Sequence, residues 1–283
     1  MALLPSLAHR LEQLQQLDRV GKPLSSAVTR LVQPRLVRNL LSGTNLGHPL
    51  HPMLTDVPIG AWTMAALLDT VGGERSAPAA DGLVGAGIAA AVPTAASGLN
   101  DWSDLLGEES RVGLVHATAN SVALSLYGAS LVARLTGHRR GGRVLSSLGM
   151  VALGVGGYLG GHLAYSRGVN VNHTAFHSPP SEWTPVLPDA ELAEGQSRRV
   201  DAAGSPVLLH RSGGRTYALD SVCTHAGGPL EEGTFADGCV TCPWHGSVFE
   251  LGDGTIRRGP ASTPQPVFET RTRDGQIEVR AQG

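Results

Sequence analysis

Cys223-Thr224-His225 and Cys242-Pro243-Trp244-His245 are the two short strings that decide how this sequence is interpreted. Each string combines one thiol with one imidazole, and both groups are common metal ligands in proteins. Two cysteines and two histidines can hold a structural zinc ion. Zinc fingers, however, usually place the two cysteines together and the two histidines together. The mixed spacing, C-x-H followed by C-x-x-H, therefore favours a different metal centre.

The surroundings of both strings resemble the Rieske [2Fe–2S] domain family. The resemblance covers residues 182 to 281 and rests on CTHAGGPLEEG, CPWHGSVFELGDG and a later GPA. It implies a [2Fe–2S] cluster in which Cys223 and Cys242 hold one iron, while His225 and His245 hold the other. Histidine ligands raise the reduction potential of such a cluster above that of an all-cysteine cluster. The implied function is one-electron transfer.

The sequence departs from the respiratory members of that family at three positions. In those members each ligand loop carries a further Cys, and the two form a disulfide. This chain has Gly228 and Trp244 there, and its remaining cysteine, Cys239, has no fourth cysteine to pair with. High-potential members also carry a Tyr two residues after the Ser that matches Ser247, where this chain has Phe249. One hydrogen bond toward the cluster is therefore missing.

The C-terminal region is expected to form an all-β domain over residues 182–283. Short runs such as VLLHR, TYALD and VFETRT alternate with Gly-rich turns, which is typical of a small antiparallel sandwich. Pro260 resembles the proline of a third loop that shields the cluster. The linker into this domain is expected at residues 171–181 and is marked by Pro179, Pro180, Pro185 and Pro188.

The middle of the chain has a different composition. Charged residues make up only 16% of the whole chain. Three long runs carry none: 82–99, 112–133 and 144–166. Each is about as long as a bilayer-spanning helix must be. A fourth run, 53–71, holds Asp56 and Asp69 near its ends. One such run could be a buried core helix, but four in succession predict an all-α four-helix transmembrane bundle over residues 47–170.

The string GHPLHPML at the start of that region resembles an uncharacterised bacterial four-helix membrane domain. Its function is not established, so the resemblance implies a fold and no activity. Before it, residues 1–46 are expected to form an amphipathic helical extension, because Leu3, Leu7, Leu11 and Leu14 recur at helical spacing. This extension could lie on the membrane surface or pack on the Rieske domain.

Four histidines are expected at one edge of the bundle: His48, His51, His116 and His162. Two histidines on facing helices can ligate a haem b or another metal, and ionisable groups inside a membrane often transfer protons. The alternative is that each histidine hydrogen-bonds a neighbouring backbone group or lipid headgroup.

Together these patterns predict a membrane-anchored protein that carries single electrons between a soluble redox partner and a membrane acceptor, neither of which the sequence identifies. The alternatives are a haem- or quinone-linked oxidoreductase and a redox sensor. The lack of an export signal and of a possible disulfide favours a bacterial inner-membrane protein, multi-pass, with the Rieske domain on the cytoplasmic face. A net charge of −2 without a basic aromatic strip argues against nucleic-acid binding.

Phe249 predicts a low reduction potential. Fewer hydrogen bonds to the cluster and its ligands stabilise the reduced form less. We therefore expect the cluster potential to lie below about 0 mV. Voltammetry of the purified protein measures it, and a strongly positive potential would contradict the prediction.

Overall fold

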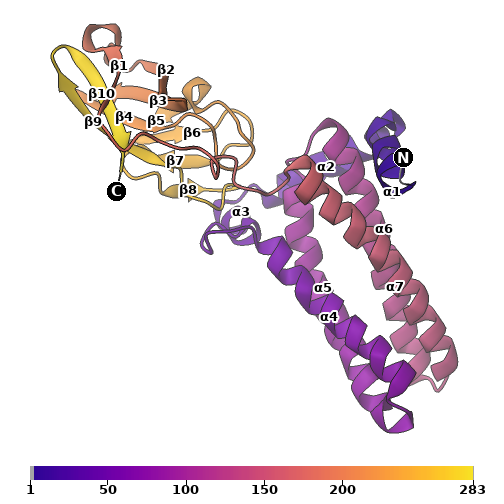
Figure 1. Ribbon diagram of the computed structural model, residues 1–283. Helices are drawn as coiled ribbons and strands as arrows, with labels where there is room; N and C mark the ends of the chain where they lie inside the picture. The colour runs from indigo at the N-terminus through magenta and orange to yellow at the C-terminus, as the bar shows by residue number, and fades with distance from the viewer. Residues whose placement is uncertain (1–2, 283) are drawn as a thin grey trace. The chain divides into compact units, whose positions relative to one another are not determined.

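The computed structural model describes residues 3–282 and divides them into two compact units. One unit combines the chain up to Val37 with Pro49–Val169, and the other combines Arg38–His48 with the chain from Asn170 onward. The first unit is helical and the second consists mostly of strands (Figure 1). A helical N-terminal region followed by a β-rich domain is the order that the sequence predicts.

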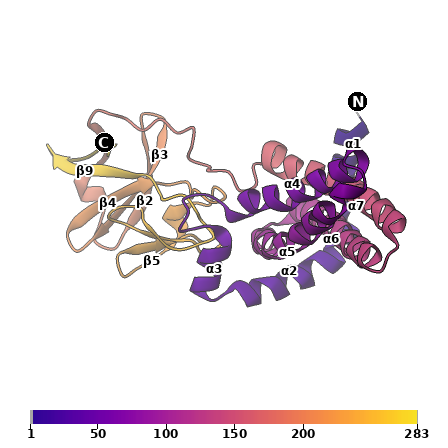
Figure 2. The same cartoon turned by 90° about the horizontal axis from the view of Figure 1, so that it is seen from below.

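Seven α-helices occur within residues 3–282. They are α1 (Leu3–Gln13), α2 (Asp18–Val32), α3 (Arg35–Ser42), α4 (Leu50–Val71), α5 (Ala77–Trp102), α6 (Gly107–Leu135) and α7 (Arg139–Gly161), the last continued by the π-helical turn η3 (His162–Ser166). The four long helices, α4 to α7, lie side by side in both views (Figures 1 and 2). Short connections join them into two hairpins, α4–α5 and α6–α7.

The expectation of four membrane spans is confirmed only in part. Within residues 3–282, two helical stretches have the length and composition to cross a membrane, Glu74–Trp102 and Arg139–Ser166. They contain the predicted runs 82–99 and 144–166. The helix α6 is long enough, but Thr, Asn and Ser side chains along its length lower its mean hydropathy. The helix α4 carries two aspartates as well as two prolines and a histidine.

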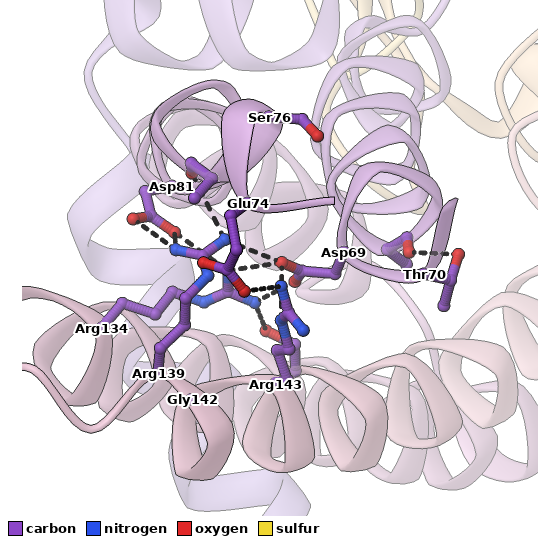
Figure 3. Close-up of polar contacts among 12 residues, drawn as sticks. Asp69, Thr70, Glu74, Ser76, Asp81, Arg134, Arg139, Gly142 and Arg143 are labelled. Atoms are coloured by element: carbon purple, nitrogen blue, oxygen red, sulfur yellow. Dashed lines mark hydrogen bonds and ion pairs between the residues drawn. The ribbon is translucent and has the colours of Figure 1, made fainter. Parts of the chain in front are cut away.

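An ion-pair network holds one end of the helical unit together (Figure 3). The side chain of Arg134 on α6 is fully buried and pairs with Asp69 of α4 and Asp81 of α5. Arg139 of α7 pairs with the same two carboxylates, and Arg143 lies 3.3 Å from Asp69. A buried charge is costly unless it is paired and hydrogen-bonded. The network therefore links the ends of all four long helices.

The first helix packs on the helical unit itself, an arrangement that the leucine spacing did not predict. Leu11 contacts apolar side chains of α6 and α7, whereas Leu7 and Leu14 are largely exposed. Glu12 lies on the buried face instead, and its carboxylate is 2.8 Å from Nε2 of His162. Because this hydrogen bond needs a partner 150 residues away, periodicity alone could not place α1.

The second unit contains two antiparallel sheets. The larger has the order β1-β10-β9-β4-β3-β2, with bounds β1 (Thr184–Pro188), β2 (Ser197–Ala202), β3 (Ser205–Ser212), β4 (Arg215–Asp220), β9 (Val267–Arg273) and β10 (Gln276–Ala281). The smaller has the order β5-β6-β7-β8, with bounds β5 (Thr234–Ala236), β6 (Cys239–Thr241), β7 (Val248–Glu250) and β8 (Ile256–Arg258). The predicted strands are all present.

The core of this unit lies between the two sheets. Leu208 and Leu219 of the larger sheet pack with Val240 and Phe249 of the smaller sheet. Alternation along β3 places the neighbours of Leu208 on the opposite face, in a second apolar cluster. Both faces of the larger sheet are thus covered, so its strands give a rigid base for the loops that follow them.

Candidate metal centre

Three loops of the β unit contact one another through hydrogen bonds and close packing. The first follows β4, the second joins β6 to β7, and the third follows β8. Thr224 of the first loop donates to the backbone oxygen of Thr263 at 2.8 Å. Ser247 of the second loop accepts the backbone N–H of Ala261 at 3.0 Å. The third loop therefore bonds to both of the loops that carry the Cys and His strings.

The first and second loops close in the same way. The backbone oxygen of Cys223 accepts from Gly227 at 2.9 Å, and that of Cys242 accepts from Gly246 at 3.1 Å. Gly227 and Gly246 have φ angles of 79° and 71°, a conformation that costs glycine little and other residues more. Each glycine thus lets its loop fold back over its own cysteine.

The two thiols are buried and touch each other. Cys223 and Cys242 are 1% and 3% exposed. The hydrogen bond from Cys223 lowers the pKa of Cys242, while the same contact and burial raise the pKa of Cys223. The backbone N–H groups two and three residues after each cysteine also point at its sulfur. Such amides stabilise thiolates and cluster sulfurs.

The two histidines of the strings also lie together. The ring centroids of His225 and His245 are 5.1 Å apart, with an angle of 83° between the rings. Burial lowers the pKa of His225 to about 3, and the charges of His245 and Arg38 act in the same direction. The imidazole is therefore neutral at physiological pH, which is the form that binds a metal.

This arrangement fits a two-iron cluster better than a zinc ion. A structural zinc needs four donors within about 2.0 to 2.3 Å of one point. Among the residues that the structure describes, no three His, Cys, Asp or Glu side chains gather in that way. The sulfurs form one pair and the imidazoles another, which matches a centre with two sulfur ligands on one iron and two nitrogen ligands on the other.

Close packing around Gly228 explains why this chain has no side chain at a position where respiratory members have a cysteine. A Cβ atom at this position would lie 2.8 Å from Sγ of Cys242 and 3.1 Å from the Trp244 ring. The indole of Trp244 is 56% exposed and stands beside His245, with ring centroids 6.3 Å apart. An aromatic surface thus replaces the disulfide next to the histidine pair.

Sequence reasoning missed the side chains that hold the first loop. Gln265 is 1% exposed; its amide nitrogen donates to the backbone oxygens of Asp220 and Val222, and its oxygen accepts from Thr224. Burial raises the pKa of Asp220, although its 2.5 Å contact with His177 opposes the shift. These residues carry no local motif, because their partners lie far away in the chain.

A segment from the N-terminal region completes the site. Arg38–His48 belongs to the β unit. Within it, Asn39 accepts the backbone N–H of Gly259 at 2.9 Å, and Thr44 donates to the backbone oxygen of Ala261 at 2.9 Å. The third loop is thus held from one side by this segment. Asn39 and Gly259 are 220 residues apart, so no sequence signal connects them.

Comparison with known proteins agrees with this geometry. A family described as "Rieske [2Fe-2S] domain" matches residues 182–269. Ferredoxin CarAc of Metapseudomonas resinovorans is 33% identical over 98 residues, which cover 34% of this chain and 92% of that protein. The chain belongs to the Rieske [2Fe–2S] family. The predicted [2Fe–2S] cofactor is therefore confirmed, and with it an electron-transfer role.

Other matches extend the comparison. The Rieske region is 32% identical over 99 residues to the anthranilate 1,2-dioxygenase ferredoxin subunit of Burkholderia cepacia, covering 35% of this chain and 92% of that subunit. A solved complex of reduced oxygenase and oxidized ferredoxin in carbazole 1,9a-dioxygenase matches with 32% identity and a TM-score of 0.34, covering 35% of this chain and 94% of that one. A second family, described as "Predicted membrane protein (DUF2231)", matches residues 47–173.

The four bundle histidines do not all come together. The rings of His51 and His116 are neighbours, with centroids 6.3 Å apart. His162 instead bonds to Glu12, and His48 belongs to the segment that groups with the β unit. Haem and quinone binding stay predictions, and of the four histidines His51 and His116 are the two whose rings are neighbours.

Gly228→Ala tests the close packing of the two ligand loops. The added methyl would collide with Sγ of Cys242, so we expect a stability loss of about 1 to 3 kcal/mol and a several-fold fall in cluster content. Iron analysis and EPR of the reduced protein measure the cluster. Gly252→Ala is the matched control, because a Cβ there meets nothing within 4 Å. Equal cluster content in both variants would refute the packing argument.

Arg38→Gln tests whether the N-terminal segment tunes the cluster. Arg38 is buried, and its positive charge acts on His225. A positive charge favours the reduced cluster, so its removal should lower the reduction potential by an amount on the order of tens of millivolts. Arg273→Gln changes the same charge on a largely exposed side chain of the same unit and should leave the potential unchanged. Voltammetry compares the two variants, and equal shifts would contradict a specific role for Arg38.

Proposed function

We propose that this protein is a membrane-anchored Rieske carrier that passes single electrons between a soluble redox partner and a membrane acceptor. The observation that carries the proposal is the paired geometry of the two strings, with two buried thiols in contact and the two imidazole rings beside each other. The cluster supplies the one-electron chemistry. The protein supplies the ligands, the surrounding amides and a dry core on one side.

The proposal assigns the ligands by burial. Cys223 and Cys242 belong to the apolar core between the sheets, so they take the inner iron. His225 and His245 take the outer iron, next to the exposed indole of Trp244. Electrons then enter and leave through the histidine side. The relatives named above are a ferredoxin and the ferredoxin subunit of a dioxygenase, and the proposal gives this chain a similar role with redox protein partners.

The exposure of apolar side chains supports a membrane location. The two most apolar helical windows are only 22% buried within the protein. The other two long helices also expose large apolar side chains, among them Met53, Val57, Met64 and Leu67 on α4 and Val122, Val132 and Leu135 on α6. Many exposed apolar side chains on all four helices favour contact with another apolar phase. We therefore propose that all four long helices span the bilayer, despite the polar residues within two of them.

The remaining parts of the proposal concern boundaries and orientation. Residues 1–46 form an extension, residues 47–170 form the membrane domain, residues 171–181 form a linker and residues 182–283 form the Rieske domain. The protein lies in a bacterial inner membrane with both termini on the cytoplasmic side. Anchoring raises the effective concentration of the cluster near a membrane acceptor.

Fractionation and reporter fusions test this function together. We expect the full-length protein to stay in the membrane pellet after alkaline carbonate extraction, and a reporter fused after Gly283 to be active only in the cytoplasm. Membranes that contain the protein should show the Rieske EPR signal when a soluble flavoprotein reductase supplies electrons.

His245→Ala is the control for the electron-transfer step. It should remain in the membrane pellet but lose the Rieske signal, because one iron loses a ligand. Release of the wild-type protein by carbonate would contradict anchoring. A reporter active only in the periplasm would contradict the orientation.

A further inference from the structure

The two helical hairpins of the first unit repeat one pattern. The leading helices carry corresponding residues at identical spacing: His51, Trp62 and Asp69 on α4, and His116, Tyr127 and Arg134 on α6. The following helices do the same: Gly87, Thr94 and Gly98 on α5, and Gly149, Gly156 and Gly160 on α7. The buried positions follow the same register: Pro58 and Ala65 on α4, and Ala123 and Ser130 on α6.

Corresponding residues also meet each other in space. Trp62 stacks on Tyr127, with ring centroids 4.0 Å apart and an interplanar angle of 8°. Asp69 forms an ion pair with Arg134. The third pair is His51 with His116, whose ring centroids are 6.3 Å apart. A residue that contacts its own counterpart lies near a two-fold axis. The helical unit is therefore a duplicated hairpin, and the two histidines lie on its pseudo-two-fold axis.

The two hairpins hold their histidines in the same way. Nδ1 of His51 donates to the backbone oxygen of Thr94 at 3.0 Å, and Nδ1 of His116 donates to the backbone oxygen of Gly156 at 2.8 Å. A carbonyl oxygen only accepts, so Nδ1 carries the proton in both rings and Nε2 keeps a lone pair. This tautomer, fixed by a backbone carbonyl, is the one found in metal-ligating histidines.

Each ring also lies against a glycine of the following helix. A Cβ on Gly98 would be 2.7 Å from the His51 ring, and one on Gly160 would be 3.0 Å from the His116 ring. The amide nitrogen of Asn120 lies 3.2 Å from Nε2 of His116, but it also donates to the backbone oxygen of His116 at 3.0 Å. Asn120 therefore keeps a partner if Nε2 binds a metal.

We propose that His51 and His116 are the two axial ligands of a haem b bound between the hairpins. A metal–imidazole bond of about 2.0 Å on each side puts the two ring centroids roughly 6 Å apart. The observed separation is 6.3 Å, with an angle of 84° between the rings. Two imidazoles that share a proton would lie closer, because their nitrogens must be about 3 Å apart. The spacing is therefore wide enough for one metal atom between the two imidazoles.

The number of donors favours haem over a bare metal ion. Transition metals in proteins take four or more ligands. Within residues 3–282, no third His, Cys, Asp or Glu joins the histidine pair to make such a set. A porphyrin supplies the four remaining nitrogens itself, so two axial histidines complete its iron. His162 does not belong to this site, because Glu12 holds its Nε2 at 2.8 Å.

Optical and EPR spectra of the detergent-solubilised full-length protein test the proposal. The probe is haem supplied during expression, or haemin titrated into the purified protein. We expect about one haem per chain by the pyridine haemochrome assay, an α-band in the reduced-minus-oxidised spectrum and a low-spin ferric EPR signal. His51→Ala and His116→Ala should each lower the haem content at least tenfold. The Rieske EPR signal should remain, since its ligands lie in the other unit.

His162→Ala is the matched control and should retain haem. Wild-type protein with a full Rieske signal that takes up no haem would overturn the proposal. Loss of haem from His162→Ala, or its retention in both His51→Ala and His116→Ala, would do the same. If the alanine variants do not accumulate, the wild-type spectra decide alone: a bis-imidazole low-spin signal supports the site and its absence refutes it. None of these results bears on the Rieske carrier function, which the cluster signal reports separately.

Discussion

The Rieske site depends on two loops that must present a sulfur and an imidazole each while the chain folds back on itself. The bond from Gly227 to Cys223 in one loop, and from Gly246 to Cys242 in the other, sets this conformation. Both glycines have positive φ, so the geometry is built into the backbone. The two thiols then belong to the apolar core between the sheets, where they are shielded from water. Buried polar groups must be satisfied. Gln265 does this for the first loop, and Asn39 does it for the third.

The helical unit must also satisfy buried polar groups, and it does so with ion pairs between helices. Charged groups within an apolar bundle are stable only when each has partners. Arg134 meets this requirement with Asp69 and Asp81, and Glu12 meets it with His162 at the opposite ends of α6 and α7. Duplication of a hairpin explains why the partners match, because an acidic position on α4 and a basic position on α6 face each other across the axis. The same symmetry places one histidine from each hairpin side by side.

The features that depend on residues close together in the chain could be predicted from the sequence. The ligand strings are short, so their spacing and the family resemblance around them predicted the cluster and its four ligands, and the strands around them followed from alternation and turns. Contacts between residues far apart in the chain could not be predicted, because no sequence pattern marks them. Arg38 and Asn39 lie in α3 and Thr44 lies in the turn after it, and none of them has a sequence pattern that relates it to the third loop. The histidines of the bundle were recognised as a set, but pairing His51 with His116 required knowledge of helix rotation. The absence of charge also led to too high an estimate of the apolarity of α6. Its Ser, Thr and Asn side chains are uncharged, but they lower its mean hydropathy.

The chain builds the cluster site from segments that lie far apart in the sequence. Arg38–His48 groups with the β unit, although the chain on both of its sides groups with the helical unit. Within this segment, Asn39 accepts the backbone N–H of Gly259 and Thr44 donates to the backbone oxygen of Ala261. The third loop therefore depends on residues that precede all four long helices. A β unit that began at Asn170 would lack both bonds, so the segment before α4 is part of the cluster site.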